Sequence, residues 1–384
     1  MAYPQNYGGQ LRANEVFASI FNMIIRQMVF ADNIKGTKSS LVDRNRVDGS
    51  MYGDTILYYA TDALRSYAWG GDAEAENLLA LDRPEDPKCQ AVVLDVFRQI
   101  RLTIDNYLTK RAWATEGAFN SFNSVMLGWI RDTKKIYDST TYNTFIGTYE
   151  TSEGKQSITI TLPTVTDNEE AENRLQAQTI ATKVADVLVE LEDVSRDYND
   201  YENIRSYTAD DFEYVWNSAW VNKIRKLDLP TIFHKDFIDK FAEYTLPARY
   251  FGTPVIVGSA KVTSDGLTIR SQIEQDVTLT EQLVFKGKTY AVGSKFHVFA
   301  GDIIPKGIDV ATTTKVVYPS YKEDSNVILK IIHKDAVPYM SGFEAGTSFF
   351  NARSLTENRY LTFGHNSLVA LHDKPFITIK AQAE

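Results

Sequence analysis

Cysteine is almost absent from this chain: Cys89 is the single one among 384 residues. A disulfide framework within one chain is therefore excluded, and a reducing compartment fits this composition. No run of apolar residues reaches the length of a membrane span, so we expect no contact with a membrane. The first residues, MAYPQNYGGQ, lack the basic start and apolar block of a secretory signal. We therefore expect a protein that folds inside a cell.

Basic residues are outnumbered, with 41 Lys and Arg against 50 Asp and Glu and a net charge of −9. Residues 167 to 213 hold 14 acidic and 4 basic residues, a balance of −10, and such a block usually forms a solvated face. A sequence-reading DNA-binding protein would show a basic stripe, and none is visible. The charge pattern thus argues against sequence-specific binding of nucleic acid.

Motifs that carry enzymatic chemistry are also missing. The five histidines are not paired at the spacing of a zinc site, and the HExxH, GxSxG and GxGxxG patterns do not occur. The tripeptide Gly287-Lys288-Thr289 resembles the end of a phosphate loop, but Gln282 stands where that loop needs its first glycine. We interpret the tripeptide as a hairpin turn. We expect no catalytic residues, no cofactor and no metal ion.

One enzymatic alternative remains, because residues 197 to 220 mix carboxylates with aromatic side chains. Paired carboxylates beside aromatic platforms are what glycoside hydrolysis requires. The same mixture also arises when a helix begins with acidic residues and buries its aromatic ones. A carbohydrate-active enzyme is therefore the alternative from a different functional class. Its residues would be Asp197, Asp200, Glu202, Asp210, Asp211, Glu213, Tyr198, Tyr201, Tyr207, Trp216 and Trp220.

The strongest positive signal is a long row of mainly apolar residues between positions 119 and 147. Its members recur mostly at steps of three and four residues, which predicts one side of a single helix about 40 Å long. We expect Gly147 to end this helix in a left-handed conformation. The row consists of Phe119, Phe122, Met126, Trp129, Thr133, Ile136, Thr140 and Phe145.

Strands surround this helix on both sides in the sequence. Residues 56–69 and 91–108 flank a polar connection and predict a long hairpin, in which Ile100, Leu102 and Ile104 alternate with polar residues. Further helices are predicted from 169 to 194, from 208 to 224 and from 235 to 244, and strands follow from residue 254 to the end. This order indicates an α+β arrangement rather than alternating βαβ units.

The segment 13–31 is a further helix candidate, with Phe17, Ile20, Phe21 and Ile24 on its apolar side. It packs either on its own core or, as an arm, on a neighbouring subunit, and the sequence leaves both readings open. A helix on a membrane surface is disfavoured, because the polar side is not rich in Lys or Arg.

With its elements in this order, the chain resembles the major capsid proteins of tailed bacteriophages with the Hong Kong 97-type fold. The resemblance is greatest to the small short-tailed phages (the podovirus and picovirus type) of Gram-positive bacteria. It is carried by ILYYATDALRSYAW with AVVLDVFRQIRLTIDNYL, by EGAFNSFNSVMLGWIRDTKKIYD, and by the C-terminal segment GFEAGTSFFNARSLTENRYLTFGHNSLVALHDKPFITIK. It covers nearly the whole chain through order and pattern, without a diagnostic short motif.

The resemblance implies a division of the chain into an arm, a loop and two domains. The N-terminal arm would be residues 1–50, the extended hairpin loop 51–112, the peripheral domain with its spine helix 113–165, the axial domain 166–315, and the strands returning to the peripheral domain 316–384. The implied function is a shell of pentamers and hexamers around double-stranded DNA, bound without sequence specificity, in an icosahedral virion assembled in the host bacterial cytoplasm. Implied partners are further copies of the chain, a portal, and candidate scaffold or decoration proteins.

Candidate assembly residues are the apolar side of the arm helix (Phe17, Ile20, Phe21, Ile24) and of the loop strand (Ile100, Leu102, Ile104). An encapsulin-type nanocompartment, which shares the fold and encloses enzymes instead of a genome, is the alternative within the same fold.

Overall fold

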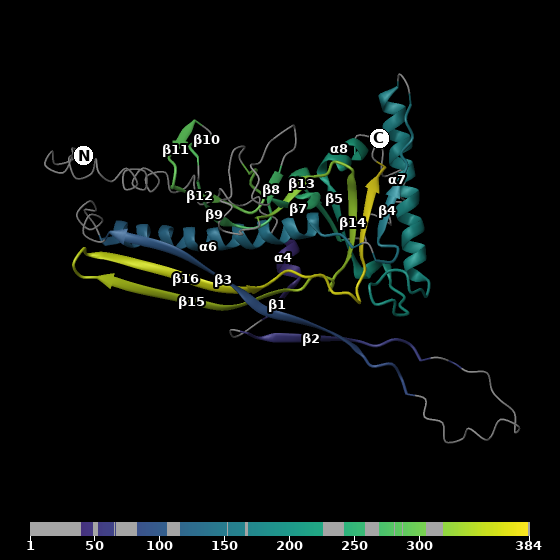
Figure 1. Cartoon of the computed structure of the whole chain (residues 1–384), viewed down its shortest axis with the longest axis horizontal. Coiled ribbons are helices and arrows are strands. Elements are labelled where there is room, and N and C mark those ends of the chain that lie inside the picture. The colour runs from purple at the N-terminus through teal and green to yellow at the C-terminus, as the bar shows by residue number, and fades with distance from the viewer. Residues whose placement is uncertain are drawn as a thin grey trace, which may run out of the picture.

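The computed structural model describes residues 40–48, 53–64, 66, 83–105, 116–151, 153–165, 168–225, 242–257, 269–279, 281–285, 287–304 and 318–382. Two five-stranded sheets organise this part of the chain, and their strand orders are β1-β15-β16-β3-β2 and β4-β17-β14-β5-β6. Helix α6 runs along the first sheet, while α7 covers the second sheet at the other end of the molecule (Figure 1). This is the α+β class that the sequence predicts.

The predicted long helix is confirmed as α6, Glu116–Thr148. Its last turns bury Tyr142 and Ile146 in a core shared with the second sheet. Gly147, however, does not end the helix in a left-handed conformation, because it lies within α6 and is not among the described glycines with positive φ. A Cβ on this residue would lie 2.0 Å from the backbone oxygen of Tyr250. The glycine is therefore needed for close packing against the 3-10 helix η4, Ala248–Tyr250.

The first sheet is long and narrow. The parallel pair of β1, Arg46–Asp48, and β15, Tyr339–Asn351, begins it. Antiparallel pairing then joins β15 to β16, Thr356–Asn366, and β16 to β3, Lys88–Asp105. The last strand is β2, Thr55–Ala60, which pairs with the first part of β3.

The predicted hairpin of 56–69 with 91–108 is present, but its paired part is shorter than expected. Residues 55–60 pair with 88–93, from Thr55 opposite Val93 to Ala60 opposite Lys88. The outer part of β3, from Leu94 to Asp105, pairs with β16 instead. Strand β3 thus pairs antiparallel with two strands, and Ile100, Leu102 and Ile104 lie opposite β16 rather than opposite β2.

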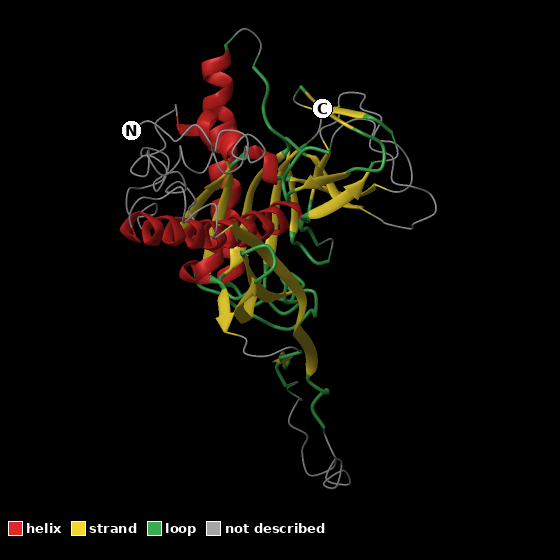
Figure 2. Ribbon diagram, turned by 90° about the vertical axis from the view of Figure 1, so that its left-hand side faces the viewer, coloured by secondary structure: helices red, strands yellow, loops and turns green. Residues whose placement is uncertain are grey.

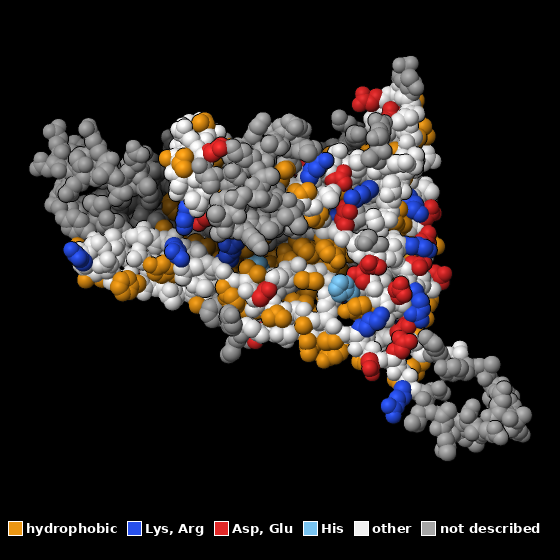
Figure 3. Space-filling view, in the orientation of Figure 1, with side chains coloured by type: hydrophobic (Ala, Val, Ile, Leu, Met, Phe, Trp, Pro, Cys, Tyr) orange, Lys and Arg blue, Asp and Glu red, His pale blue; other side chains and the backbone are white. Residues whose placement is uncertain are grey.

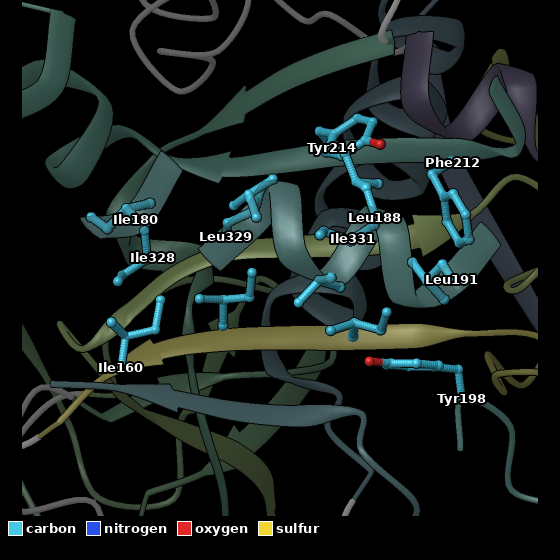
Figure 4. Close-up of a cluster of buried hydrophobic side chains, with 14 of the residues drawn as sticks. Ile160, Ile180, Leu188, Leu191, Tyr198, Phe212, Tyr214, Ile328, Leu329 and Ile331 are labelled. Carbon is cyan, nitrogen blue, oxygen red and sulfur yellow. The ribbon is translucent and has the colours of Figure 1, made fainter. Parts of the chain in front are cut away.

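The second sheet is the middle layer of three. Its strands are β4, Ser157–Ile160; β17, Phe376–Ala381; β14, Val327–His333; β5, Phe212–Asn217; and β6, Ala242–Leu246. All seven residues of β14 are buried, as expected for a strand that is covered on both faces. Helix α7, Glu169–Glu192, covers one face (Figure 4), and the last turns of α6 with α4, Ser40–Arg44, cover the other.

The predicted helix from 169 to 194 is confirmed as α7. The Asn168 side chain accepts a hydrogen bond from the Ala171 N–H, 3.0 Å away, and caps the helix start. The buried side includes Ile180, Val184 and Leu188, as the spacing predicts, whereas Val194 lies beyond the helix end and is exposed.

The helix predicted from 208 to 224 is wrong. Thr208 begins only a single 3-10 turn, η3, Ala209–Asp211, and residues 212–217 form strand β5 before the short helix α8, Ser218–Arg225. Five of the six residues of FEYVWN are buried between β14 and β6, so pairing inside the sheet overrides the helical spacing. Of the helix predicted at 235–244, residues 242–244 belong to strand β6, and the others lie outside the described residues.

A lobe of short strands is inserted between residues 252 and 323. Its three-stranded sheet contains β7, Gly252–Val257; β13, Tyr318–Glu323; and β8, Ile269–Ser271. Two strand pairs complete it: β9, Gln275–Thr278, with β12, Lys295–Val298; and β10, Leu283–Phe285, with β11, Lys288–Tyr290. The hairpin turn predicted at Gly287 is confirmed by its φ of +77°.

The two sheets share the C-terminal part of the chain. Strands β14 and β17 belong to the second sheet, and β15 and β16 belong to the first. The strands of 316–384 are therefore divided between the sheets, and the division into domains stays a prediction. Within the described residues, no helix is long and apolar enough to cross a membrane.

Candidate assembly surfaces

The β2–β3 hairpin carries apolar side chains on both of its faces. On the inner face, Ile56 and Tyr58 pack with Val92 and Leu94 of β3, together with Met340 and Leu371. On the outer face, Leu57 is 49% exposed and Tyr59 is 65% exposed, and Val93 also remains partly open. A strand pair that covers a core on one side usually presents polar residues on the other. Hydrophobic side chains are visible along the lower edge of the molecule, over β2 (Figure 3).

This hairpin extends beyond the rest of the molecule. In both views it leaves the two-sheet body at its lower end (Figure 1 and Figure 2). Contiguous exposed apolar surface often marks a contact between proteins. This projecting hairpin with its exposed apolar face therefore has the properties of a contact surface.

The predicted residues of the loop strand lie on one face of the first sheet. Their cross-strand neighbours are Leu361 opposite Ile100, Arg359 opposite Leu102, and Glu357 opposite Ile104. Ile104 is only 2% exposed within a single subunit, whereas Ile100 and Leu102 are partly buried. Leu102→Asp would therefore disturb packing within one subunit as well as any contact between subunits. The arm residues Phe17, Ile20, Phe21 and Ile24 lie outside the described residues.

A groove runs beside α6, first between α6 and the residues of α4 and β1, then between α6 and strands β15 and β16. It contains two adjoining cavities of about 310 and 410 Å³, and both are lined by Arg131 and Glu344. Lys134 donates to the Glu344 carboxylate at 2.8 Å. Arg131 and Lys135 are exposed and make no ion pair with any residue in the described ranges. The groove could therefore accept an acidic segment of another chain.

Exposed aromatic residues mark the far end of the first sheet. Phe349 is 63% exposed, and its neighbour Phe350 is also open to solvent. Successive residues of a strand point to opposite faces, so this tip is apolar on both sides. The next exposed apolar residue is Leu355, which has a φ of +55° in the turn between β15 and β16.

The acidic residues considered for glycoside hydrolysis have separate structural partners. Asp200 accepts from Gln156 Nε2 and contacts His372 Nδ1, each at 2.7 Å. Glu213 is buried, accepts from Asn45 Nδ2 at 3.3 Å, and has its pKa raised by that burial. The hydroxyl and backbone N–H of Thr208 donate to Asp211 and lower the pKa of its carboxyl. These carboxylates hold different parts of the fold together.

Sequence reasoning missed the outer face of β2 and the aromatic tip of the first sheet. The segment ILYYA is apolar at every position, which is unusual for a hairpin strand with one solvent-exposed face. That missing alternation was the available signal for Leu57 and Tyr59. The adjacent Phe349 and Phe350 give a similar signal, because neighbouring strand residues cannot both face one core.

Comparison with known proteins identifies the fold. No protein family model and no curated protein matches this sequence. Among solved structures, a chain from the capsid structure of Staphylococcus phage Andhra matches with a TM-score of 0.55 and 12% identity, over 88% of this chain and 83% of that one. The chain has the Hong Kong 97-type capsid fold. A second match, from the structure of head fiber and inner core protein gp22 of native bacteriophage P68, has a TM-score of 0.56 and 10% identity, over 88% and 84% of the two chains.

Proposed function

We propose that this chain is the major capsid protein of a tailed bacteriophage and assembles, as pentamers and hexamers, into an icosahedral head around double-stranded DNA. The observation that carries the proposal is the projecting β2–β3 hairpin with its exposed outer face, in a chain that shares its fold with a phage capsid structure over 88% of its length. The virion is the proposed location, after assembly in the host cytoplasm.

The outer face of the hairpin supports self-assembly energetically. Full burial of a Leu or Val side chain contributes about 1.5–3 kcal/mol relative to full exposure. Leu57, Tyr59 and Val93 are all partly exposed, so each would contribute about 1 kcal/mol on a neighbouring copy. One such contact is weak, but a closed ring repeats it, and the repeated contacts reinforce each other.

Charge supports a second copy of the chain as the partner. Residues 67–86, which connect the hairpin strands in the sequence, hold six acidic residues and one arginine. The groove beside α6 presents Arg131 and Lys135 without ion-pair partners among the described residues. We propose that the acidic connection of one copy approaches the groove of the next.

The proposed relation to DNA is confinement rather than tight binding. Each phosphate contact made by Lys or Arg would strengthen binding and hold the genome against the wall. The chain has a net charge of −9 and no basic stripe, which fits a wall that encloses DNA without gripping it. A portal, and a scaffold or decoration protein, are further proposed partners.

Assembly is tested by electron microscopy of the purified protein with paired variants. Leu57→Ser combined with Tyr59→Ser removes the apolar outer face, whereas Thr55→Ser changes a polar, exposed residue of the same strand. We expect closed shells from wild type and Thr55→Ser, and folded but unassembled subunits from the double variant. Wild-type protein that stays monomeric at high concentration would refute the proposed function. Normal shells from the double variant would show that the hairpin face is not an assembly contact.

The content of the shells separates a phage head from an encapsulin. Particles from phage-infected cells should contain double-stranded DNA and a portal ring at one vertex. A shell filled with a cargo enzyme and lacking DNA would favour the nanocompartment instead.

A further inference from the structure

Asp62 joins the hairpin to a loop that follows α7. We call residues 195–205 the clamp loop; its ends are paired by hydrogen bonds between Ser195 and Arg205 of 3.0 and 2.9 Å. Asp62 lies just beyond β2, and its Oδ1 accepts from the Ile204 N–H at 2.8 Å. Its Oδ2 accepts from Arg196 Nη1 at 2.7 Å. The Ile204 N–H, followed by the Arg196 guanidinium, lowers the pKa of Asp62 to about 2, so this carboxylate is charged at neutral pH.

The same loop also holds the other hairpin strand. Lys88, the first residue of β3, donates from Nζ to the backbone carbonyl oxygen of Tyr201 at 2.6 Å. Its ammonium group also lies 5.1 Å from the centre of the Tyr201 ring. Arg205 Nη2 donates to the backbone carbonyl oxygen of Thr61 at 2.8 Å. Both strands are therefore attached to the clamp loop at the point where the chain leaves the sheet.

The clamp loop is itself braced on its inner side. The Asn199 side chain donates to the Asn203 oxygen and accepts from the Asn203 N–H, both at 2.8 Å, and both residues are buried. Arg205 and Asn203 donate to Asp373, each at 2.9 Å. Because the side chains that face the core are satisfied within the subunit, the loop presents a fixed surface to the hairpin.

We propose that the clamp loop sets the direction in which the hairpin leaves the body, with Asp62 and Lys88 as its positioning residues. This role rests on the proposed function, because a hairpin needs a fixed direction only if it must meet a neighbour. The exposed hairpin face contributes little per contact, so a freely swinging hairpin would lose much of that energy when it became ordered on assembly. Charged hydrogen bonds at both strands hold the hairpin in one direction before assembly, so little conformational entropy is lost when it meets a neighbour.

The clamp loop also explains part of the 197–220 segment. In the sequence, its mixture of acidic and aromatic residues makes it a candidate for catalysis. In the structure, the backbone carbonyl oxygen of Tyr201 and the backbone N–H of Ile204 bind the hairpin. The Asp200 carboxylate stabilises the loop by its contact with His372 Nδ1. The segment thus anchors the β2–β3 hairpin of the same chain.

The direction of the hairpin can be measured with two spin labels, because Cys89 is the only native cysteine and is exposed on β3. A second label at Val189→Cys occupies an exposed position on α7. Distances between the labels would be measured in unassembled subunits carrying Asp62→Ala, the milder Asp62→Asn, or Lys88→Ala. Asp86→Ala is the control, because Asp86 is an exposed acidic residue just before β3 with no hydrogen bond to a described residue.

We expect the distance distribution to become at least twofold wider in Asp62→Ala and Lys88→Ala, with a smaller increase in Asp62→Asn and none in Asp86→Ala. The same clamp variants should reduce the yield of uniform shells severalfold relative to the control. An unchanged distribution in both alanine variants would overturn the clamp, and a wider one with normal shells would overturn its role in assembly. Absence of shells from wild type would instead refute the proposed function, while the distances would still decide whether the clamp fixes the hairpin.

Discussion

Two glycines of α6 should respond oppositely to the same substitution. Within a helix, alanine is favoured over glycine by about 1 kcal/mol. Outside its own helix turn, a Cβ at Gly128 meets no atom within 4 Å in the part of the chain that the structure describes, so Gly128→Ala should stabilise the subunit by about 0.5–1 kcal/mol. A Cβ at Gly147 would lie 2.0 Å from the Tyr250 oxygen and 2.5 Å from the Tyr250 carbonyl carbon, and both of these are backbone atoms.

The backbone at Tyr250 cannot move away freely. Tyr250 is buried and Phe251 is fully buried in the core that the end of α6 shares with the second sheet. Restoring normal contact requires α6 and η4 to separate by about 1 Å or more, which belongs in the upper part of the overpacking range, about 2–3 kcal/mol. After the helical preference of alanine is subtracted, Gly147→Ala should destabilise the subunit by about 1–2 kcal/mol.

The measurement is urea unfolding of unassembled subunits, followed by circular dichroism. The two variants should differ by about 1.5–3 kcal/mol in the free energy of unfolding, with opposite signs relative to wild type. Equal stabilisation by both substitutions would refute the close approach of Gly147 to η4. Equal destabilisation would refute the open environment of Gly128.

Two buried bases should give stability a characteristic pH dependence. Burial, and next the nearby Lys374, lowers the pKa of His333 to about 4, and its Nδ1 accepts from the Asp335 N–H at 3.1 Å. The unfolded chain then binds the proton more readily, so stability should fall by at most about 3 kcal/mol from pH 7 to pH 4, and His333→Gln should lack this slope in unfolding curves. Burial likewise lowers the pKa of Lys330 to about 7, so the free energy of unfolding should rise with pH between about 7 and 10. If the Lys330→Met variant showed the same rise, Lys330 would not be its cause.

Helices α6 and α7 could be predicted from the sequence because their signals are local. The apolar spacing of α6 and the acidic first turn of α7 depend on residues within one element. Strand β5 could not be predicted in this way, because FEYVWN follows a genuine helix-start signal at Thr208 and becomes a strand only by pairing with β14 and β6. Gly147 shows the same limit, since Tyr250 lies about a hundred residues further along the chain.

The candidate assembly surfaces were harder to predict than the fold. The alternation of Ile100, Leu102 and Ile104 correctly indicates a half-buried strand, but it does not tell a neighbouring subunit from the subunit's own core. The clamp on Asp62 joins residues about 140 positions apart and uses backbone groups of Tyr201 and Ile204, which no residue pattern reveals.

The two sheets are connected directly where the chain crosses from β14 to β15. This crossing is short and contains Ala336 and Val337, which are fully buried. The Tyr142 hydroxyl of α6 donates to the Val337 oxygen at 3.0 Å, so the long helix joins the sheets at the same place. Dense packing leaves such a junction little freedom to bend. If the hairpin meets a neighbouring copy as proposed, the clamp loop and this junction are two connections through which a displacement of the hairpin would reach the second sheet.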